Sequence, residues 1–210
     1  LILINCSVAL HVAKAKSMTG TIFLSSSFNA PCYANLSKSR VVHNGIETDY
    51  VGLGGGVAVV PELMSLTSKS TKNTLDIADR RFADSGMPVA VHVELSNLGN
   101  NSVTISSAMP GLQPVALGGG IFCCCQAKHV TLQLQTVNNS FNSIVDQYSG
   151  PMFVQGAGIW SSCSLSVQHS NVSTNTLPLG QNLTNASNAS YAGGGLFAQD
   201  SPVWISHSTF

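Results

Sequence analysis

The sequence predicts an all-β solenoid, a fold in which short strands stack along one axis and share a core. Three observations predict it. Glycine-rich runs, each followed by a short apolar burst, recur along the chain. Segments that alternate apolar and polar residues follow them, and stretches rich in Asn, Ser and Gly separate the units. One such unit cannot bury its apolar side chains alone, whereas stacked units can.

The glycine-rich runs give the repeat its period. Four copies read GGGV at 54–57, GGGI at 118–121, GAGI at 156–159 and GGGL at 193–196, and weaker copies begin at Gly20 and at Gly86-Met87-Pro88. The repeat starts therefore fall near residues 20, 56, 88, 120, 158 and 195, with spacings of 32–38 residues. We expect about six coils in a single domain spanning residues 1–210. Flexible glycine linkers are the alternative, but linkers would not keep phase with alternating strands.

The alternating segments predict strands with one buried face. They read SVALHVAK at 7–14, VTLQLQTV at 130–137, SLSVQHS at 164–170 and PVWISHS at 202–208. An antiparallel sandwich is the competing all-β architecture. Asn-Gly, the strongest signal for a hairpin, occurs only at Asn44-Gly45, which favours the solenoid.

Composition narrows the classes of partner. The chain has nine basic and nine acidic side chains and only 9% charged residues, against about 25% in ordinary globular proteins. A net charge of zero disfavours nucleic acid as a partner, and the abundance of Ser, Thr, Asn and Gly is typical of an extracellular β-rich surface. No apolar stretch reaches 18 residues, so we expect no transmembrane helix. The opening LILINCSVALHVAKAK lacks the layout of a signal peptide, so we expect a segment of a longer protein.

The glycine-rich corners, the apolar strands that follow them and the final VWISHSTF resemble a known group of repeats. They are similar to the right-handed parallel β-helix repeats of polymorphic outer membrane proteins and related pectin-lyase-like surface proteins. Those repeats carry Gly-Gly-Ala-Ile and Phe-x-x-Asn motifs. GGGV, GGGI, GAGI and GGGL approximate the first, whereas SFN at 27–29, SFN at 140–142 and STF at 208–210 supply only the Phe of the second. The resemblance implies a right-handed parallel β-helix that continues beyond both ends as a longer solenoid.

The cysteines predict a contact between successive coils. No Cys-x-x-Cys pair is accompanied by suitably spaced His, so we expect no zinc site, no other metal and no cofactor. Cys125 and Cys163 each lie five residues after a repeat start. Equivalent positions on successive coils lie about 4.8 Å apart, close to disulfide reach. We therefore expect Cys125 and Cys163 to be neighbours, joined by a disulfide or lying in a ladder of buried thiols.

Eight Asn-x-Ser/Thr sequons suggest a secreted, glycosylated chain located outside the cell or at its surface. The alternative is that the turns of a β-helix simply favour Asn and Ser. The acceptors are Asn5, Asn35, Asn100, Asn138, Asn171, Asn182, Asn185 and Asn188.

A polysaccharide lyase or glycoside hydrolase of the pectin-lyase-like fold is the alternative function. The segment TLDIADRRFAD at 74–84 concentrates charge, and a lyase would use an arginine as base with aspartates as calcium ligands. We favour a solvated helix or loop held by local ion pairs. The polygalacturonase motifs Asn-Thr-Asp, Asp-Asp, Gly-His-Gly and Arg-Ile-Lys are absent, so we assign no catalytic residue. His169 and His207 lie 11 and 12 residues after their repeat starts, which predicts that they do not align.

We therefore expect a non-catalytic module that is structural or adhesive. It would present loops and a strand face to carbohydrate or protein. Binding residues are not identifiable from the sequence, but the aromatic candidates are Tyr148, Trp160, Tyr191 and Trp204. Alternation points the side chain of Trp204 outward, opposite to Val203 and Ile205.

Overall fold

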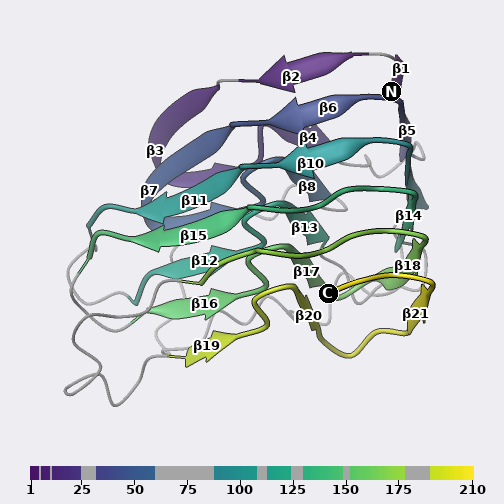
Figure 1. Cartoon of the computed structure of the whole chain (residues 1–210). Helices are drawn as coiled ribbons and strands as arrows, with labels where there is room; N and C mark the ends of the chain where they lie inside the picture. Colours follow the sequence, from purple (N-terminus) through teal and green to yellow (C-terminus); the bar gives the residue numbers. More distant parts are fainter. Residues whose placement is uncertain are drawn as a thin grey trace.

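The computed structural model contains β-strands paired in parallel within four sheets (Figure 1). It describes residues 1–4, 6–9, 11–24, 32–59, 88–107, 113–123, 130–148, 152–177 and 190–210. Across these ranges there is no helix, and hence none that could cross a membrane. The all-β class and the parallel strands of the prediction are confirmed.

The six-stranded and three-stranded sheets are formed by strands that follow one another along the chain. The six-stranded sheet consists, in order, of β1 (Ile2–Ile4), β5 (Cys32–Ser37), β9 (Val89–Glu94), β14 (Val130–Gln135), β18 (Ser164–Gln168) and β21 (Val203–Ser206). The three-stranded sheet consists of β2 (Ser7–Ala9), β6 (Arg40–Val42) and β10 (Asn97–Gly99), and single bridges continue it through Asn138, Asn171 and Thr209.

The other two sheets have five and seven strands. The five-stranded sheet consists of β4 (Ile22–Leu24), β8 (Val57–Val59), β13 (Ile121–Cys123), β17 (Ile159–Ser161) and β20 (Leu196–Ala198). In the seven-stranded sheet, β7 (Gly45–Leu53) is long enough to pair with two sets of strands, and β3 (Val12–Thr19) pairs along both halves of β7. The first half of β7 pairs with β11 (Ser102–Ile105), which is followed by β15 (Ser143–Asp146). The second half pairs with β12 (Val115–Leu117), which is followed by β16 (Phe153–Gln155) and β19 (Ser190–Ala192).

The chain passes through the sheets in the same order each time. After β5, β6, β7 and β8 it returns to the six-stranded sheet as β9, which pairs with β5 (Figure 1). We call one such passage a round. Every strand pair in the described ranges is parallel, and Asn44-Gly45 joins β6 to β7 without forming a hairpin.

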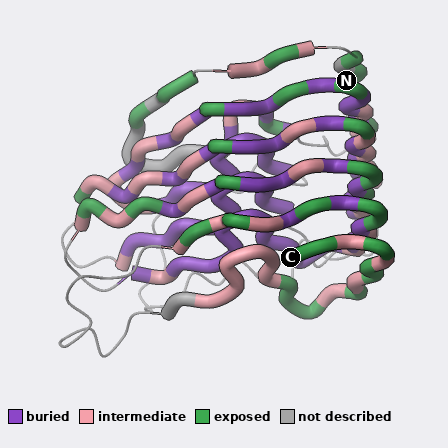
Figure 2. The backbone as a smooth tube through the Cα atoms, in the orientation of Figure 1, coloured by how far each residue is buried: buried purple, intermediate pink, exposed green. Residues whose placement is uncertain are grey.

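The apolar bursts that form β8, β13 and β17 are buried on both faces, whereas β4 and β20, at the two ends of the same sheet, are partly exposed. In β13, Ile121 and Cys123 belong to one hydrophobic cluster and Phe122 belongs to another. Figure 2 shows this buried interior in purple. A strand covered on both sides needs no polar positions, which explains why these segments are continuously apolar.

The alternating segments form strands with one solvent-facing side. In β14, Val130, Leu132 and Leu134 are buried, whereas Gln133 and Gln135 are exposed. This pattern confirms the predicted half-buried strands at 130–137 and 164–170. At 202–208 the prediction is wrong for Ile205, which is 49% exposed because β21 is the last strand of its sheet.

Three hydrophobic clusters fill the space between the sheets. The largest joins the six-, three- and five-stranded sheets and contains Leu36, Val41, Ile121 and Leu132. The second lies between the five-stranded sheet and the second half of the seven-stranded sheet. The third lies between the two halves of the seven-stranded sheet.

Four of the six predicted repeat starts are structurally equivalent. The residues that follow positions 56, 120, 158 and 195 are register partners in the five-stranded sheet: Val57, Ile121, Ile159 and Leu196. The backbone requires glycine just before these starts. Gly118 has a φ of +67°, and a Cβ there would lie 2.2 Å from the carbonyl oxygen of Ile121.

The other two repeat starts are corrected by the register. Ile22 pairs with Val57, so the first start is residue 21 and not residue 20. The start at 88 is wrong, because Val89 opens β9 and pairs with Cys32 in the six-stranded sheet. Val57 pairs directly with Ile121, so residues 57–120 form one round and not two. Residues 60–87, between β8 and β9, lie outside the described part of the chain.

An asparagine ladder marks the corner between the three-stranded sheet and the first half of the seven-stranded sheet. The Nδ2 of Asn44 donates to Oδ1 of Asn101 (3.0 Å), Asn101 donates to Asn142 (3.1 Å) and Asn142 donates to Asn175 (3.0 Å). Each acceptor Oδ1 also takes the backbone N–H of the preceding asparagine in the ladder, at 2.9–3.2 Å. The ladder thus satisfies backbone groups that the corner would otherwise bury without partners.

The residue before each ladder asparagine has a left-handed backbone. The φ angles lie between 55° and 58° at His43, Asn100, Phe141 and Thr174. A serine row serves the preceding corner in the same way: the backbone N–H of Ser39 donates to Oγ of Ser96 (3.0 Å).

Replacing Asn101 with Leu should lower the free energy of unfolding by more than about 3 kcal/mol. The change takes the acceptor from the backbone N–H of Asn44 and the side-chain donor from the Val41 carbonyl, and it leaves Asn44 Nδ2 and Asn142 Oδ1 with one hydrogen bond fewer each. A buried group left without a partner costs about 1–3 kcal/mol, and each further lost hydrogen bond costs about 0.5–1.5 kcal/mol. Urea unfolding measures the loss, with the exposed Gln135→Leu as control. A loss below about 1 kcal/mol would show that the ladder is not a structural constraint.

Candidate functional site

The outer face of the six-stranded sheet is the candidate functional surface. We call it the outer face. Because the strands pair in register, their outward side chains form rows across the sheet. The middle row contains Asn35, His92, Gln133, Ser166 and Trp204. The flanking rows are Tyr33, Ala90, Thr131 and Ser164 on one side and Ser37, Glu94, Gln135, Gln168 and Ser206 on the other.

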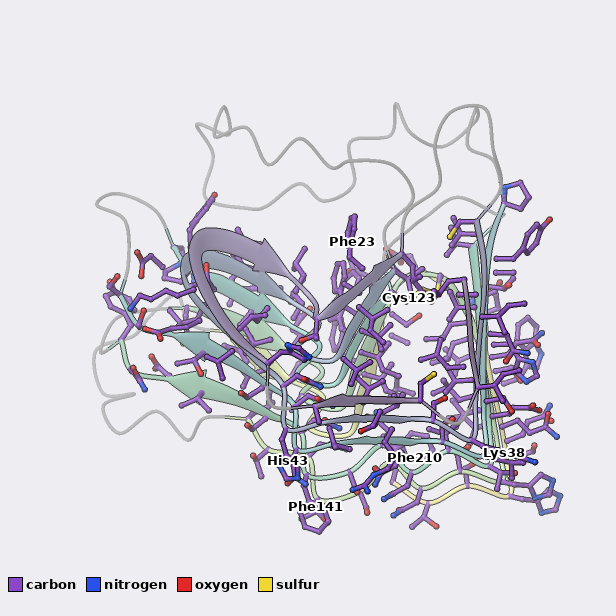
Figure 3. All side chains as sticks on the ribbon, turned by 90° about the horizontal axis from the view of Figure 1, so that it is seen from above. Phe23, Lys38, His43, Cys123, Phe141 and Phe210 are labelled. Atoms are coloured by element: carbon purple, nitrogen blue, oxygen red, sulfur yellow. A yellow bond between two sulfur atoms is a disulfide. The ribbon has the colours of Figure 1, made fainter. Side chains whose placement is uncertain are left out.

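The geometry of the outer face is regular. Its strands pair from β1 to β21 without a register shift, and neighbouring strands in a sheet lie about 4.8 Å apart. In Figure 3 these side chains project to the right, away from the core. An extended ligand would therefore meet side chains at a regular spacing, which are polar over most of β9, β14 and β18 and apolar at Ile2 and Ile4 on β1.

The outer face carries hydrogen-bonding groups and little charge. Its rows supply amides, hydroxyls and the imidazole of His92. Glu94 is its one carboxylate in the described strands, and its Oε1 accepts a hydrogen bond from Ser37 Oγ (2.7 Å). Gln168 Nε2 donates to Ser166 Oγ (3.4 Å).

Two exposed aromatic side chains lie toward opposite ends of the outer face. Tyr33 on β5 is 60% exposed and Trp204 on β21 is 59% exposed. Four strand steps separate β5 from β21, which corresponds to roughly 19 Å. The outward orientation predicted for Trp204 is confirmed by its register with the outward-facing Ser166.

The other aromatic candidates do not reach this surface. Trp160 is only 2% exposed, stacks on Phe122 with ring centroids 4.8 Å apart and donates from Nε1 to Gln155 Oε1 (3.0 Å). Its predicted exposure is wrong because β17 has hydrophobic clusters on both faces. Tyr148 packs against the third cluster, and the side chain of Tyr191 is outside the described set.

His169 and His207 align, contrary to the prediction from their offsets. Their rings are parallel within 3° with centroids 4.9 Å apart, and each residue has a φ of 48°. Ser161 pairs with Ala198 and Leu165 pairs with Val203, so the chain takes one residue more between these two pairs after β20 than after β17. This extra residue accounts for the different offsets.

The resolved acidic side chains other than Glu94 and Asp200 lie on the seven-stranded sheet and its connections. Lys14 on β3 hydrogen bonds to Glu47 on β7, which raises the pKa of Lys14 and lowers the pKa of Glu47. Asp49 accepts hydrogen bonds from Ser106 (3.1 Å) and Ser107 (2.7 Å). Burial raises the pKa of Asp146. The outer face therefore lies apart from these carboxylates.

The predicted charged patch lies outside the described residues. It comprises Asp76, Asp79, Arg80, Arg81 and Asp84. In the part of the chain that the structure describes, no three His, Cys, Asp or Glu side chains come together as ligands for a metal ion.

Cys163 forms a disulfide with Cys123, with Cα atoms 6.2 Å apart, so the predicted pairing with Cys125 is wrong. Counting five residues from each glycine assumes connections of equal length. Residues 124–129 join β13 to β14, whereas residues 162–163 join β17 to β18. Cys124 and Cys125 lie outside the described residues, and Cys6 and Cys32 are free thiols.

The described sequons fall on two sides of the molecule. Asn35 lies on the outer face, and its Oδ1 is buried without a hydrogen-bond donor. Asn100, Asn138 and Asn171 lie on the side of the three-stranded sheet. The acceptors outside the described residues are Asn5, Asn182, Asn185 and Asn188.

Comparisons of the chain with protein-family models, curated proteins and solved structures find no match. The geometry of the molecule itself must therefore support any functional proposal.

Removing the disulfide by the double change Cys123→Ser and Cys163→Ser should lower the free energy of unfolding by about 3–4 kcal/mol. The bond closes a sequence separation of 40 residues, and cross-links of this length restrict the unfolded chain by about that amount. Guanidinium unfolding measures the loss, with Cys32→Ser as the control. Fragment mass spectrometry of a non-reduced digest must identify Cys123 as the partner. A bond from Cys124 or Cys125 to Cys163 would contradict the assignment.

Proposed function

We propose that the chain is a right-handed parallel β-helix module of an extracellular or cell-surface protein, and that its outer face binds carbohydrate without cleaving it. Parallel pairing in all four sheets and repeated passage through them in one order support the solenoid. The glycine-led strands that resemble pectin-lyase-like repeats support the same fold. The remainder of a longer solenoid would be its neighbour in the chain.

The observation that carries the proposal is the composition of the outer face. Rows of amide and hydroxyl groups lie between the exposed rings of Tyr33 and Trp204. Sugar hydroxyls exchange hydrogen bonds with such groups, and the apolar faces of sugar rings stack on aromatic side chains. Because Glu94 is the only carboxylate in the described rows, a neutral polysaccharide is the best match.

Two other readings fit this surface less well. Protein interfaces usually contain a central apolar or aromatic anchor, whereas the centre of this face holds Gln133, Thr131 and Ser166. Hydrolysis of a glycosidic bond usually needs two carboxyl groups about 5–9 Å apart, and the described rows contain only one.

Replacing Trp204 with Ala should weaken binding to a neutral polysaccharide at least about tenfold, because an aromatic anchor contributes more than about 1.4 kcal/mol. Affinity electrophoresis with neutral and acidic polysaccharides measures the change. Phe141→Ala is a matched control, since Phe141 is 57% exposed on another side of the molecule (Figure 3).

The same polysaccharides are incubated with the protein and assayed for new reducing ends and unsaturated products. If either kind of product forms, the chain is a polysaccharide lyase or hydrolase and the proposal of binding without cleavage is wrong. If Trp204→Ala and Phe141→Ala weaken polysaccharide binding equally, the outer face is not the binding surface.

A further inference from the structure

We propose that the side of the three-stranded sheet, here called the narrow side, carries N-linked glycans at Asn100 and Asn171. The outer face would then stay bare. The narrow side comprises β2, β6, β10, the bridges through Asn138, Asn171 and Thr209, and the corner row of His43, Asn100, Phe141 and Thr174. This inference rests on the proposed extracellular location.

The fold gathers three sequons that are far apart in the sequence. Asn138 bridges to Asn97 on one side and to Asn171 on the other, so Asn138 and Asn171 occupy one outward row in successive rounds. Asn100 lies in the adjacent corner row, where its N–H donates to the Ser140 carbonyl (3.1 Å). Figure 3 shows His43 and Phe141 of this corner row on one side, away from the outward side chains of the six-stranded sheet.

Asn100 is well placed to bear a glycan. It is exposed and has a left-handed backbone with a φ of 55°, a conformation that asparagine tolerates better than most residues. The ladder contact at this corner belongs to the next residue, Asn101, and not to Asn100. A glycan on Asn100 would therefore leave the corner intact.

Asn171 and Asn138 lie too close together for both to carry a glycan. They are bridge partners on adjacent rounds, so two glycans there would start about 5 Å apart. Asn171 is exposed, whereas Asn138 is partly buried between Asn97 and Asn171. Asn171 Nδ2 donates to Asn138 Oδ1 (3.1 Å), and a glycosylated Asn171 would keep one N–H for this bond. The geometry therefore favours Asn171.

Asn35 is the described sequon on the outer face, and we expect it to carry no glycan. Its Oδ1 is buried, and its side chain lies in the middle row of the outer face beside His92. A glycan there would cover the surface proposed to bind polysaccharide. Glycans confined to Asn100 and Asn171 would leave that surface open.

The reaction is transfer from a lipid-linked oligosaccharide diphosphate. Asn Nδ2 forms a bond to the anomeric carbon, the bond from that carbon to the diphosphate oxygen breaks, and the lipid diphosphate leaves. A base of the transferase takes the proton lost from Nδ2. Because transfer precedes folding, the folded and secreted chain must accommodate every glycan that it carries.

The test is expression of the whole chain in a eukaryotic secretory host, followed by enzymatic glycan release in heavy-oxygen water and peptide mass spectrometry. Asn100→Gln and Asn171→Gln should each remove one glycan. Asn35→Gln and Asn138→Gln are matched controls and should remove none. Enzymatic removal of the glycans should leave polysaccharide binding unchanged.

The outcomes separate this inference from the proposed function. A glycan on Asn35 or Asn138, or bare Asn100 and Asn171, overturns the inference while binding can still be measured. A secreted chain without any glycan overturns the inference and leaves the binding proposal to the Trp204→Ala measurement. Loss of the Trp204 effect with glycans found at Asn100 and Asn171 overturns only the binding proposal.

Discussion

The hydrogen bonds of the asparagine ladder are the constraint on which the remaining structure depends. At each corner the chain turns through a left-handed residue and would bury unpaired backbone groups. The amides of Asn44, Asn101 and Asn142 satisfy these groups and also join successive rounds. A one-residue slip would break the corner and turn every following side chain to the opposite face of its sheet.

A fixed register is what allows a surface to form from residues far apart in the sequence. Asn35 and Trp204 share one row because β5, β9, β14, β18 and β21 all keep the same phase. The same phase brings Asn138 beside Asn171 on the narrow side. Two neighbouring sides of one molecule thus acquire different chemistry, one rich in amides and aromatic rings and the other rich in sequons.

The sequence predicted the features that depend on local chemistry. Glycine before an apolar burst identified the strands of the five-stranded sheet, and alternation identified the outward direction of Trp204. The errors came from counting along the chain. The predicted pairing of Cys125 with Cys163 and the predicted lack of alignment between His169 and His207 were both wrong. Both errors arose because connection lengths differ between rounds. The burial of Trp160 depends on a second cluster formed by distant strands, which alternation in one segment cannot reveal.

The unequal connections after the five-stranded sheet have an evolutionary consequence. Two residues, 162–163, separate β17 from β18, and four residues, 199–202, separate β20 from β21, whereas β8 ends at Val59 and β9 begins only at Val89. The asparagine corners show no such variation, since each consists of one left-handed residue and one asparagine. Insertions can therefore accumulate at one edge of the molecule without disturbing the register of the sheets. That edge is where related proteins could gain new recognition segments while keeping the same scaffold.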